Sequence, residues 1–265
     1  MKKSDILESV MKEFRALAAI PRPSGHEKAV SDYLLAHLRE MGLEVVQDER
    51  NNIIADLAAA PGRENAPRVI LQGHMDMVCV AAPGVAYDPL HDAIRLVEEG
   101  DVLHAEGTSL GADDGIGVAI ILHILRHVKE NGPVRAIFTV DEERGMTGAI
   151  HLAEKYLKDA QYLINCDSEN LDELCVGSAG GVDLTFSRTM KFVAAAKGKA
   201  WQIAVEGLKG GHSGEEIGEG RANALRLLSL ALAGLQEAGV DFSLASLTGG
   251  KAKNAIASEA EAIVV

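Results

Sequence analysis

The chain has 265 residues, of which 47% are hydrophobic and 25% charged, a composition typical of a folded globular protein and not of a disordered one. Its formal charge of −13 argues against nucleic acid or a membrane surface as partner, because either requires an electropositive face. The sequence shows neither an export signal nor a stretch of the length and apolar character of a membrane span. Three cysteines without metal-binding spacing fit a cytoplasmic protein with reduced thiols.

The N-terminal part of the chain predicts two helices followed by two short strands. Helical periodicity over residues 4–20 ends at the PRPSG sequence, because proline removes a backbone donor and restricts the residue before it. Ser24 and Glu27 have the spacing of a capping box, which predicts a second helix over residues 25–41. Two short strands are expected within residues 43–57.

The middle of the chain predicts a mostly parallel sheet. Three apolar stretches, residues 68–74, 134–140 and 162–167, are expected to be buried strands. Helical patterns at residues 117–129 and in the HLAEKYL sequence separate them. Strands that alternate with helices are typical of an α/β domain, in which ligands bind beyond the carboxyl ends of the strands.

The pattern of elements changes after residue 186. An alternating strand at WQIAVEGL, a helix at NALRLLSLALAGLQEAG and two further strands within residues 241–265 follow one another. This β-α-β-β order indicates a small α+β unit with an antiparallel sheet. The sequence therefore predicts two domains, residues 1–186 and 187–265.

Side chains that can bind a metal lie at the ends of all three predicted buried strands and at one glycine-rich turn, GADDG. Taken singly, the DEER sequence could be a solvated acidic turn, and GADDG a turn with a helix cap. Together, carboxylates that meet at one sheet edge repel one another unless a cation binds them. We therefore predict a divalent metal centre formed by residues from this set: His74, Asp113, Asp114, Asp141, Glu142, Glu143 and Asp167.

His74 and Asp76 lie two residues apart at the end of the first buried strand, so their side chains point the same way. A carboxylate beside a histidine fixes the imidazole tautomer and makes it a better metal ligand, although the pair could also be a hydrogen-bonded polar pair at a strand end. Histidine and carboxylates without cysteine favour zinc, or else manganese or cobalt. The number of carboxylates favours two ions, held about 3.5–4 Å apart by a bridging carboxylate.

Six stretches of the sequence, in order, resemble the aminoacyl-histidine dipeptidases. This Xaa-His, or carnosine-cleaving, group belongs to the di-zinc aminoacylase and tripeptidase superfamily of metallopeptidases. The resemblance covers essentially the whole chain and implies most of a catalytic domain, followed by the first part of a lid domain that forms a homodimer in full-length members. The stretches are GHMDMV, GTSLGADDGIG, VDEERGMTGA, INCDSE, GSAGGVD and GLKGGHSG.

The resemblance also implies a set of metal ligands. His74 and Asp167 bind the first ion, Asp113 bridges the two ions, and Glu143 binds the second, while Asp114 has no ligand role. The second ion in the family takes a further histidine from near the end of a longer chain, and this sequence has no counterpart of that segment. The remaining seven histidines match no ligand motif of the family: His26, His37, His91, His104, His123, His127 and His151.

Three further residues receive roles by the same resemblance. Asp76 orients His74, and Glu142 is the general base that acts on a metal-bridged water. His212, in the lid, helps to bind the substrate and to polarise the scissile carbonyl. The implied reaction is hydrolysis of a small peptide, a dipeptide with a C-terminal histidine, and we expect this shortened chain to perform it poorly or not at all.

Two other functions fit the same sequence. The substrate could instead be a tripeptide or an acylated amino acid, because part of the substrate pocket lies outside the segment that this chain matches. The chain could also be a metal-binding fragment without catalytic activity. Metal content and peptide hydrolysis, measured together, distinguish these three functions.

Overall fold

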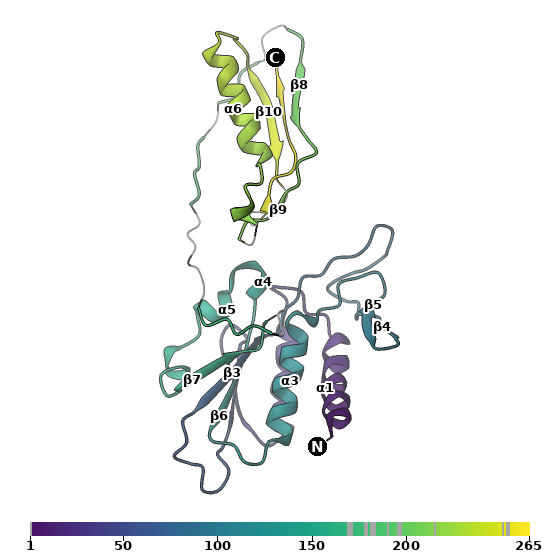
Figure 1. The fold of residues 1–265 in the computed structure, drawn as a ribbon, viewed down its shortest axis with the longest axis vertical. Helices are drawn as coiled ribbons and strands as arrows, with labels where there is room; N and C mark the ends of the chain where they lie inside the picture. Colours follow the sequence, from purple (N-terminus) through teal and green to yellow (C-terminus); the bar gives the residue numbers. More distant parts are fainter. Residues whose placement is uncertain are drawn as a thin grey trace. The chain divides into compact units, whose positions relative to one another are not determined.

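The computed structural model describes residues 2–168, 172–177, 180, 184–189, 191–194, 198–214, 216–250, 252 and 255–265. Contacts within the chain define two compact units, Met1–Ala179 and Gly180–Val265, each with its own hydrophobic core (Figure 1). The predicted domain boundary at residue 186 lies somewhat later in the chain and stays a prediction.

The first unit contains a five-stranded mixed sheet with the strand order β1-β2-β6-β3-β7. The three strands predicted to be parallel, β6, β3 and β7, pair in parallel, whereas β1 and β2 add to the sheet in antiparallel fashion. The predicted α/β class is therefore confirmed. The strands are β1 (Glu44–Gln47), β2 (Ile53–Leu57), β3 (Val69–His74), β6 (Val134–Thr139) and β7 (Tyr162–Asn165).

Three helices form the main core with this sheet: α1 (Lys3–Ala18), α2 (Lys28–Glu40) and α3 (Ala112–His127). Helix α1 lies beside α3, which in turn packs on β3 (Figure 1). Phe14 of α1 and Phe138 of β6 are both buried in this core. Burial of an aromatic side chain of this size stabilises the fold by about 1.5–3 kcal/mol, so the core holds the sheet firmly in place.

The segment after β6 forms three short elements: α4 (Glu142–Gly145), α5 (Thr147–Ile150) and the 3-10 helix η1 (Glu154–Tyr156). The sequence predicted a helix at HLAEKYL, but only η1 forms there, because Ala153 has an extended backbone (φ −67°, ψ 128°). Leu152 and Tyr156 pack on a small second cluster made by Ile54, Ile70 and Ile137 of the sheet. A separate hairpin joins β4 (Leu96–Glu99) to β5 (Val102–Ala105).

The second unit has the predicted β-α-β-β order. Its strands β8 (Trp201–Val205), β10 (Leu244–Gly249) and β12 (Ala260–Val264) form an antiparallel sheet with β12 in the centre. Helix α6 (Ala224–Glu237) packs on this sheet through its buried apolar residues, and the Asn223 side chain caps its start by accepting the backbone N–H of Arg226. The predicted antiparallel α+β unit is confirmed.

Two small elements complete the second unit. Strand β9 (Gly211–His212) pairs with β11 (Ala255–Ile256), and the 3-10 helix η2 (Ile217–Glu219) follows β9. Across the described part of both units, none of the helices combines the length and the apolar character that crossing a lipid bilayer requires.

Candidate metal centre

The imidazole of His74 is at the centre of the predicted site. His74 ends strand β3 and is almost completely buried, with 1% of its side chain exposed. Its Nε2 atom lies 2.9 Å from Asp113 Oδ1 and 3.8 Å from Asp167 Oδ2, whereas Nδ1 lies 3.3 Å from Asp76 Oδ1. Nε2 therefore faces the carboxylates of Asp113 and Asp167, and Nδ1 faces that of Asp76.

Among the residues that the structure describes, two groups of side chains are close enough to hold a metal ion. The first consists of His74, Asp113 and Asp167, and the second of His74, Glu142 and Glu143, with the ligand atoms of each group within 4.8 Å of one another. All four residues predicted as ligands are in these groups. Their imidazole nitrogen and carboxylate oxygens are a donor set that suits zinc or manganese, so the residues present fit a divalent cation.

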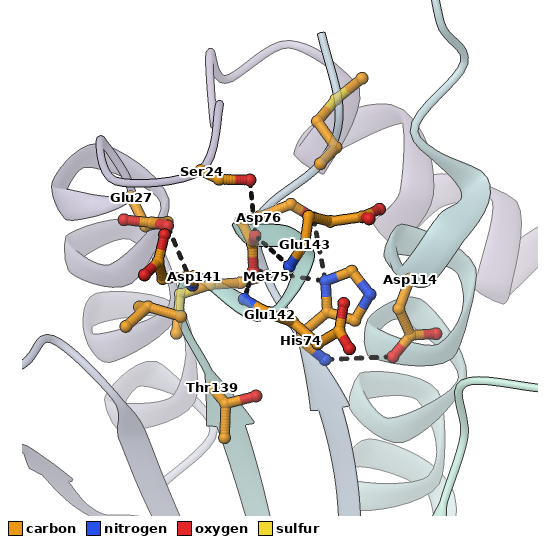
Figure 2. A network of polar contacts seen from close by, with 12 residues as sticks. Ser24, Glu27, His74, Met75, Asp76, Asp114, Thr139, Asp141, Glu142 and Glu143 are labelled. Carbon is orange, nitrogen blue, oxygen red and sulfur yellow. Dashed lines mark hydrogen bonds and ion pairs between the residues drawn. The ribbon is translucent and has the colours of Figure 1, made fainter. Parts of the chain in front are cut away.

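Asp76 connects the two groups (Figure 2). Its side chain is fully buried and accepts hydrogen bonds from the backbone N–H of Glu142 (3.1 Å) and of Glu143 (3.3 Å). The Ser24 hydroxyl donates a third hydrogen bond to it, at 2.8 Å. Burial raises the pKa of Asp76, but the hydrogen bonds from His74, Glu142 and Ser24 outweigh it and lower that pKa, so the carboxylate stays ionised.

Three carboxyl groups of the site, those of Glu142, Glu143 and Asp167, have raised pKa values. Burial, together with the Asp113 charge, raises the pKa of Glu143 to about 7 and that of Asp167 to about 6. Burial also raises the pKa of Glu142. For His74, burial lowers the pKa, but the Asp76 hydrogen bond and charge outweigh it and raise the pKa to about 10. The cluster thus retains protons that a divalent cation would displace.

The two consecutive aspartates of GADDG point in different directions. Both depart from helical geometry at the start of α3, and the peptide bond between them is cis. Asp113 faces His74 with 52% of its side chain exposed, whereas buried Asp114 accepts the backbone N–H of His74 at 3.1 Å. A Cβ atom at Gly73 or Gly117 would lie within 2.4 Å of an Asp114 carboxylate oxygen, so only glycine fits at both positions.

The predicted capping box does not form. The N-cap of α2 is Glu27, which makes no capping hydrogen bond with its side chain, and the Ser24 hydroxyl bonds to Asp76 instead. Glu27 Oε1 accepts the backbone N–H groups of Gly25 (2.6 Å) and Asp141 (3.0 Å). The sequence pattern of this segment predicted only a helix boundary, whereas its polar side chains support the loops of the site.

Other predicted residues lie in the second unit or outside the described residues. His212 lies in β9 of the second unit, so its role in substrate binding stays a prediction. Parts of two family motifs fall outside the described residues, namely residue 169 of INCDSE and residues 178–179 and 181–183 of GSAGGVD. Within the described residues, neither metal-binding group includes any of the seven histidines expected to play no part in the site.

Comparison with known proteins supports the resemblance found in the motifs. The sequence pattern of peptidase family M20/M25/M40 matches residues 70–242, which is more than half of the chain. The chain is 39% identical over 255 residues to the cytosol non-specific dipeptidase of Escherichia coli (strain K12), which covers 95% of this chain and 52% of that protein.

Solved structures agree with this assignment. The crystal structure of aminoacylhistidine dipeptidase from Vibrio alginolyticus matches with a TM-score of 0.68 and 38% identity, over 97% of this chain and 52% of that one. Aminopeptidase PepT from Bacillus cereus shares the fold, with a TM-score of 0.54 and 20% identity over 97% of this chain and 65% of that one. The chain spans about half the length of the two dipeptidases. On the family match and the shared fold, the chain belongs to peptidase family M20/M25/M40.

Proposed function

We propose that this chain carries the metal centre of a dipeptidase that hydrolyses short peptides, with a preference for a C-terminal histidine. The observation that carries the proposal is the convergence of the His74 imidazole with the carboxylates of Asp113, Asp167 and Glu143 at one sheet edge. The names of the similar E. coli and V. alginolyticus proteins support peptide hydrolysis, and the second name supports the preference for histidine.

Two divalent ions, zinc in our proposal, would occupy the two groups of ligands. His74 and Asp167 would bind the first ion and Glu143 the second, with Asp113 between them. Burial and then the Asp113 charge raise the pKa of Glu143, which supports a position of the Asp113 carboxylate close to that of Glu143. When bound, the ions would polarise the peptide carbonyl and lower the pKa of an attacking water.

In this proposal Glu142 is the general base. Its carboxyl is half-buried and its pKa is raised, which suits a group that must take a proton from water near neutral pH and later give it to the leaving amine. The Asp76 carboxylate accepts hydrogen bonds from the backbone N–H groups of Glu142 and Glu143. The backbone at both residues is thereby fixed, and the two adjacent side chains can serve different purposes.

The rest of the proposal concerns the whole protein. His212 would help to bind the peptide, residues from 187 onward would form part of a lid, and full-length relatives would form a homodimer through that lid in the cytoplasm. Because the chain spans about half of its dipeptidase relatives, we expect low peptide turnover from residues 1–265 alone. A tripeptide or an acylated amino acid stays the alternative substrate, and a metal-binding fragment without activity stays the alternative function.

Zinc calorimetry and peptide hydrolysis with one matched pair of variants test this proposal. The chain should bind zinc, and Glu142→Gln should keep the zinc that Glu143→Gln loses. In the E. coli dipeptidase, the substitution that corresponds to Glu142→Gln should abolish turnover while metal content stays the same. Loss of metal in Glu142→Gln, with retention in Glu143→Gln, would mean that the two roles are exchanged.

A substrate panel then distinguishes the remaining alternatives. It contains an Xaa-His dipeptide, a dipeptide that lacks histidine, a tripeptide and an acylated amino acid, each with zinc or manganese. Faster cleavage of the Xaa-His dipeptide supports the proposed preference. Zinc binding without cleavage of any of the four, by this chain and by a full-length homologue, would favour the non-catalytic alternative.

A further inference from the structure

Arg22 lies buried directly behind the metal centre, with 2% of its surface exposed. Its Nη1 donates hydrogen bonds to the backbone carbonyls of Met75 and Asp76, both at 3.0 Å. Its Nη2 donates to the carbonyl of Gly111 at 2.5 Å. A single guanidinium thus connects the segment that follows His74 with the turn that carries Asp113.

Two glycines provide the space that the guanidinium occupies. A Cβ atom at Gly111 or at Gly115 would lie 2.6 Å from Arg22 Nη2, closer than any side chain atom can approach without displacement. Gly111 also has a left-handed backbone (φ +70°), which favours glycine. The GADDG turn is therefore shaped around Arg22 as well as around its own aspartates.

The positive charge of Arg22 is not used in an ion pair. Within the described residues no carboxylate forms one with it, and its hydrogen bonds go to backbone carbonyls. Arg135, another buried arginine of this unit, instead bonds directly to the carboxylates of Asp56 and Asp159. A buried cation is costly unless its contacts compensate, so three carbonyl contacts from two loops indicate a specific positioning function.

Neighbouring residues extend this support to a third segment of the site, the one that carries Glu142 and Glu143. Ser24 bonds to the Asp76 carboxylate, and Glu27 accepts the backbone N–H of Asp141, the residue before Glu142. Arg144 Nη1 in turn donates to the Ser24 carbonyl at 2.9 Å. Residues 22–27 therefore contact three of the four segments that carry the proposed ligands, namely those of His74, Asp113 and Glu143.

We propose that Arg22 is a positioning residue that sets the separation between His74 and Asp113, and hence the affinity of the centre for a divalent metal. The proposal rests on the proposed metal-binding function, and it concerns a residue that touches neither the ion nor the peptide. A lysine cannot replace the arginine, because one ammonium group cannot span carbonyls on two loops as a planar guanidinium does.

Charge and geometry predict opposite results for substitutions at this position. If Arg22 positions the loops, Arg22→Lys and Arg22→Met should both lower zinc affinity, by about 10-fold or more, as loss of outer-sphere support for metal ligands commonly does. If Arg22 acted only through its charge, Arg22→Met should raise the affinity for a cation and Arg22→Lys should leave it unchanged.

The experiment uses residues 1–265 and measures zinc affinity by competition with a chromogenic chelator. Arg135→Lys is the matched control, because Arg135 is also buried, with 6% of its surface exposed, but lies at the opposite end of β6 from the metal centre. We expect Arg22→Lys to lose affinity and Arg135→Lys to retain it, with thermal unfolding recorded for both. Equal zinc affinity in Arg22→Lys and wild type would overturn the proposal.

A second variant and a measurement on the metal-free protein test the positioning role independently of Arg22→Lys and of zinc binding. Gly115→Ala should displace the guanidinium and lower zinc affinity, whereas Gly234→Ala in α6, where a Cβ meets nothing within 4 Å, should not. Hydrogen exchange of the metal-free protein should be faster at residues 74–77 and 111–114 in Arg22→Lys, but not in Arg135→Lys. If wild type fails to bind zinc, the proposed function fails, and unchanged exchange in these two loops separately refutes the positioning role.

Discussion

The two ends of strand β6 carry clusters of charged side chains that differ in charge balance. At the start of the strand, Arg135 donates to both oxygens of Asp56 at 2.8 and 2.9 Å and to Asp159 at 2.7 Å. Arg68 forms ion pairs with the same two carboxylates, at 2.9 and 3.0 Å. Two guanidinium groups therefore meet two carboxylates, and this cluster needs no further ligand.

The loops at the far end of β6 bring together a group in which carboxylates outnumber cations. Asp113, Asp167, Glu142 and Glu143 surround His74, and burial with mutual repulsion raises the pKa of three of these four carboxyl groups. A balanced cluster stabilises the fold by itself, whereas an unbalanced one is stable only with bound protons or a cation. This difference separates a structural charge cluster from a binding site.

The largest effect is expected at His74, which belongs to both ligand groups. His74→Ala should weaken zinc binding by at least about 100-fold, because loss of outer-sphere support alone commonly costs 10- to 100-fold. Zinc should raise the melting temperature of wild type and not that of the variant. His91→Ala, at an exposed histidine paired with Asp88, is the control. If His74→Ala retained the zinc affinity of wild type, the cluster at the end of β6 would not be the metal site.

The balanced end should respond in the opposite way. Arg135→Met leaves two carboxylates with one fewer partner and should destabilise the fold by about 2–3 kcal/mol, somewhat less than a fully buried pair because Asp56 and Asp159 are partly exposed. Its zinc affinity should equal that of wild type. Chemical denaturation and the chelator competition measure the two quantities separately, and reduced zinc affinity would show that the ends of β6 are coupled.

The contrast also explains how much the sequence could predict. The positions of strands β3, β6 and β7 were predictable because they are short apolar runs bounded by polar turns, and His74, Glu142 and Asp167 follow from where these runs end. The predicted burial of β7 is wrong, because this strand lies at the edge of the sheet and its side chains are exposed. The convergence of their side chains follows from parallel pairing, which is a rule of topology and requires no knowledge of contacts. Motif resemblance added the separate roles of the two glutamates.

The support behind the site was not predictable in this way. Ser24 and Glu27 have the spacing of a local capping box, yet both bond to residues more than fifty positions away, Asp76 and Asp141. Arg22 lies between two prolines in a segment that local rules describe only as a helix breaker. Tertiary hydrogen bonds overrode local preference here, and a single sequence contains no signal of them.

A smaller effect should separate the two aspartates of GADDG. Asp113→Asn removes a charge that faces His74 and should weaken zinc binding by about 10-fold. Asp114→Asn keeps an oxygen that can accept the His74 backbone N–H, so its zinc affinity should stay close to wild type. Calorimetry on the pair measures the difference. A larger loss of zinc affinity in Asp114→Asn than in Asp113→Asn would mean that Asp114, and not Asp113, is the ligand.

The smallest effect concerns a third charge cluster, on the helices, which is balanced like the start of β6. Glu13 of α1, with 4% of its surface exposed, lies 2.9 Å from His37 Nε2 and 3.1 Å from Arg126 Nη2. Burial raises its pKa, but hydrogen bonds and charges from His37 and Arg126 outweigh it and lower the pKa. Because the pKa is lower when folded, this stabilisation is present above the unfolded pKa and is lost as pH falls through the folded value.

Glu13→Gln should therefore lower the free energy of unfolding by about 1–2 kcal/mol at pH 7 and make it less dependent on pH in the acid range. Urea denaturation between pH 3 and pH 7 measures both effects, with exposed Glu8→Gln as the control. The free energy of the wild type and of the variant should converge as pH falls, because protonation removes the same charge that the substitution removes. If the difference in unfolding free energy between wild type and variant stayed constant down to pH 3, the Glu13 contribution would come from packing and hydrogen-bond geometry. Charge balance would then not be the reason this cluster is stable without a ligand.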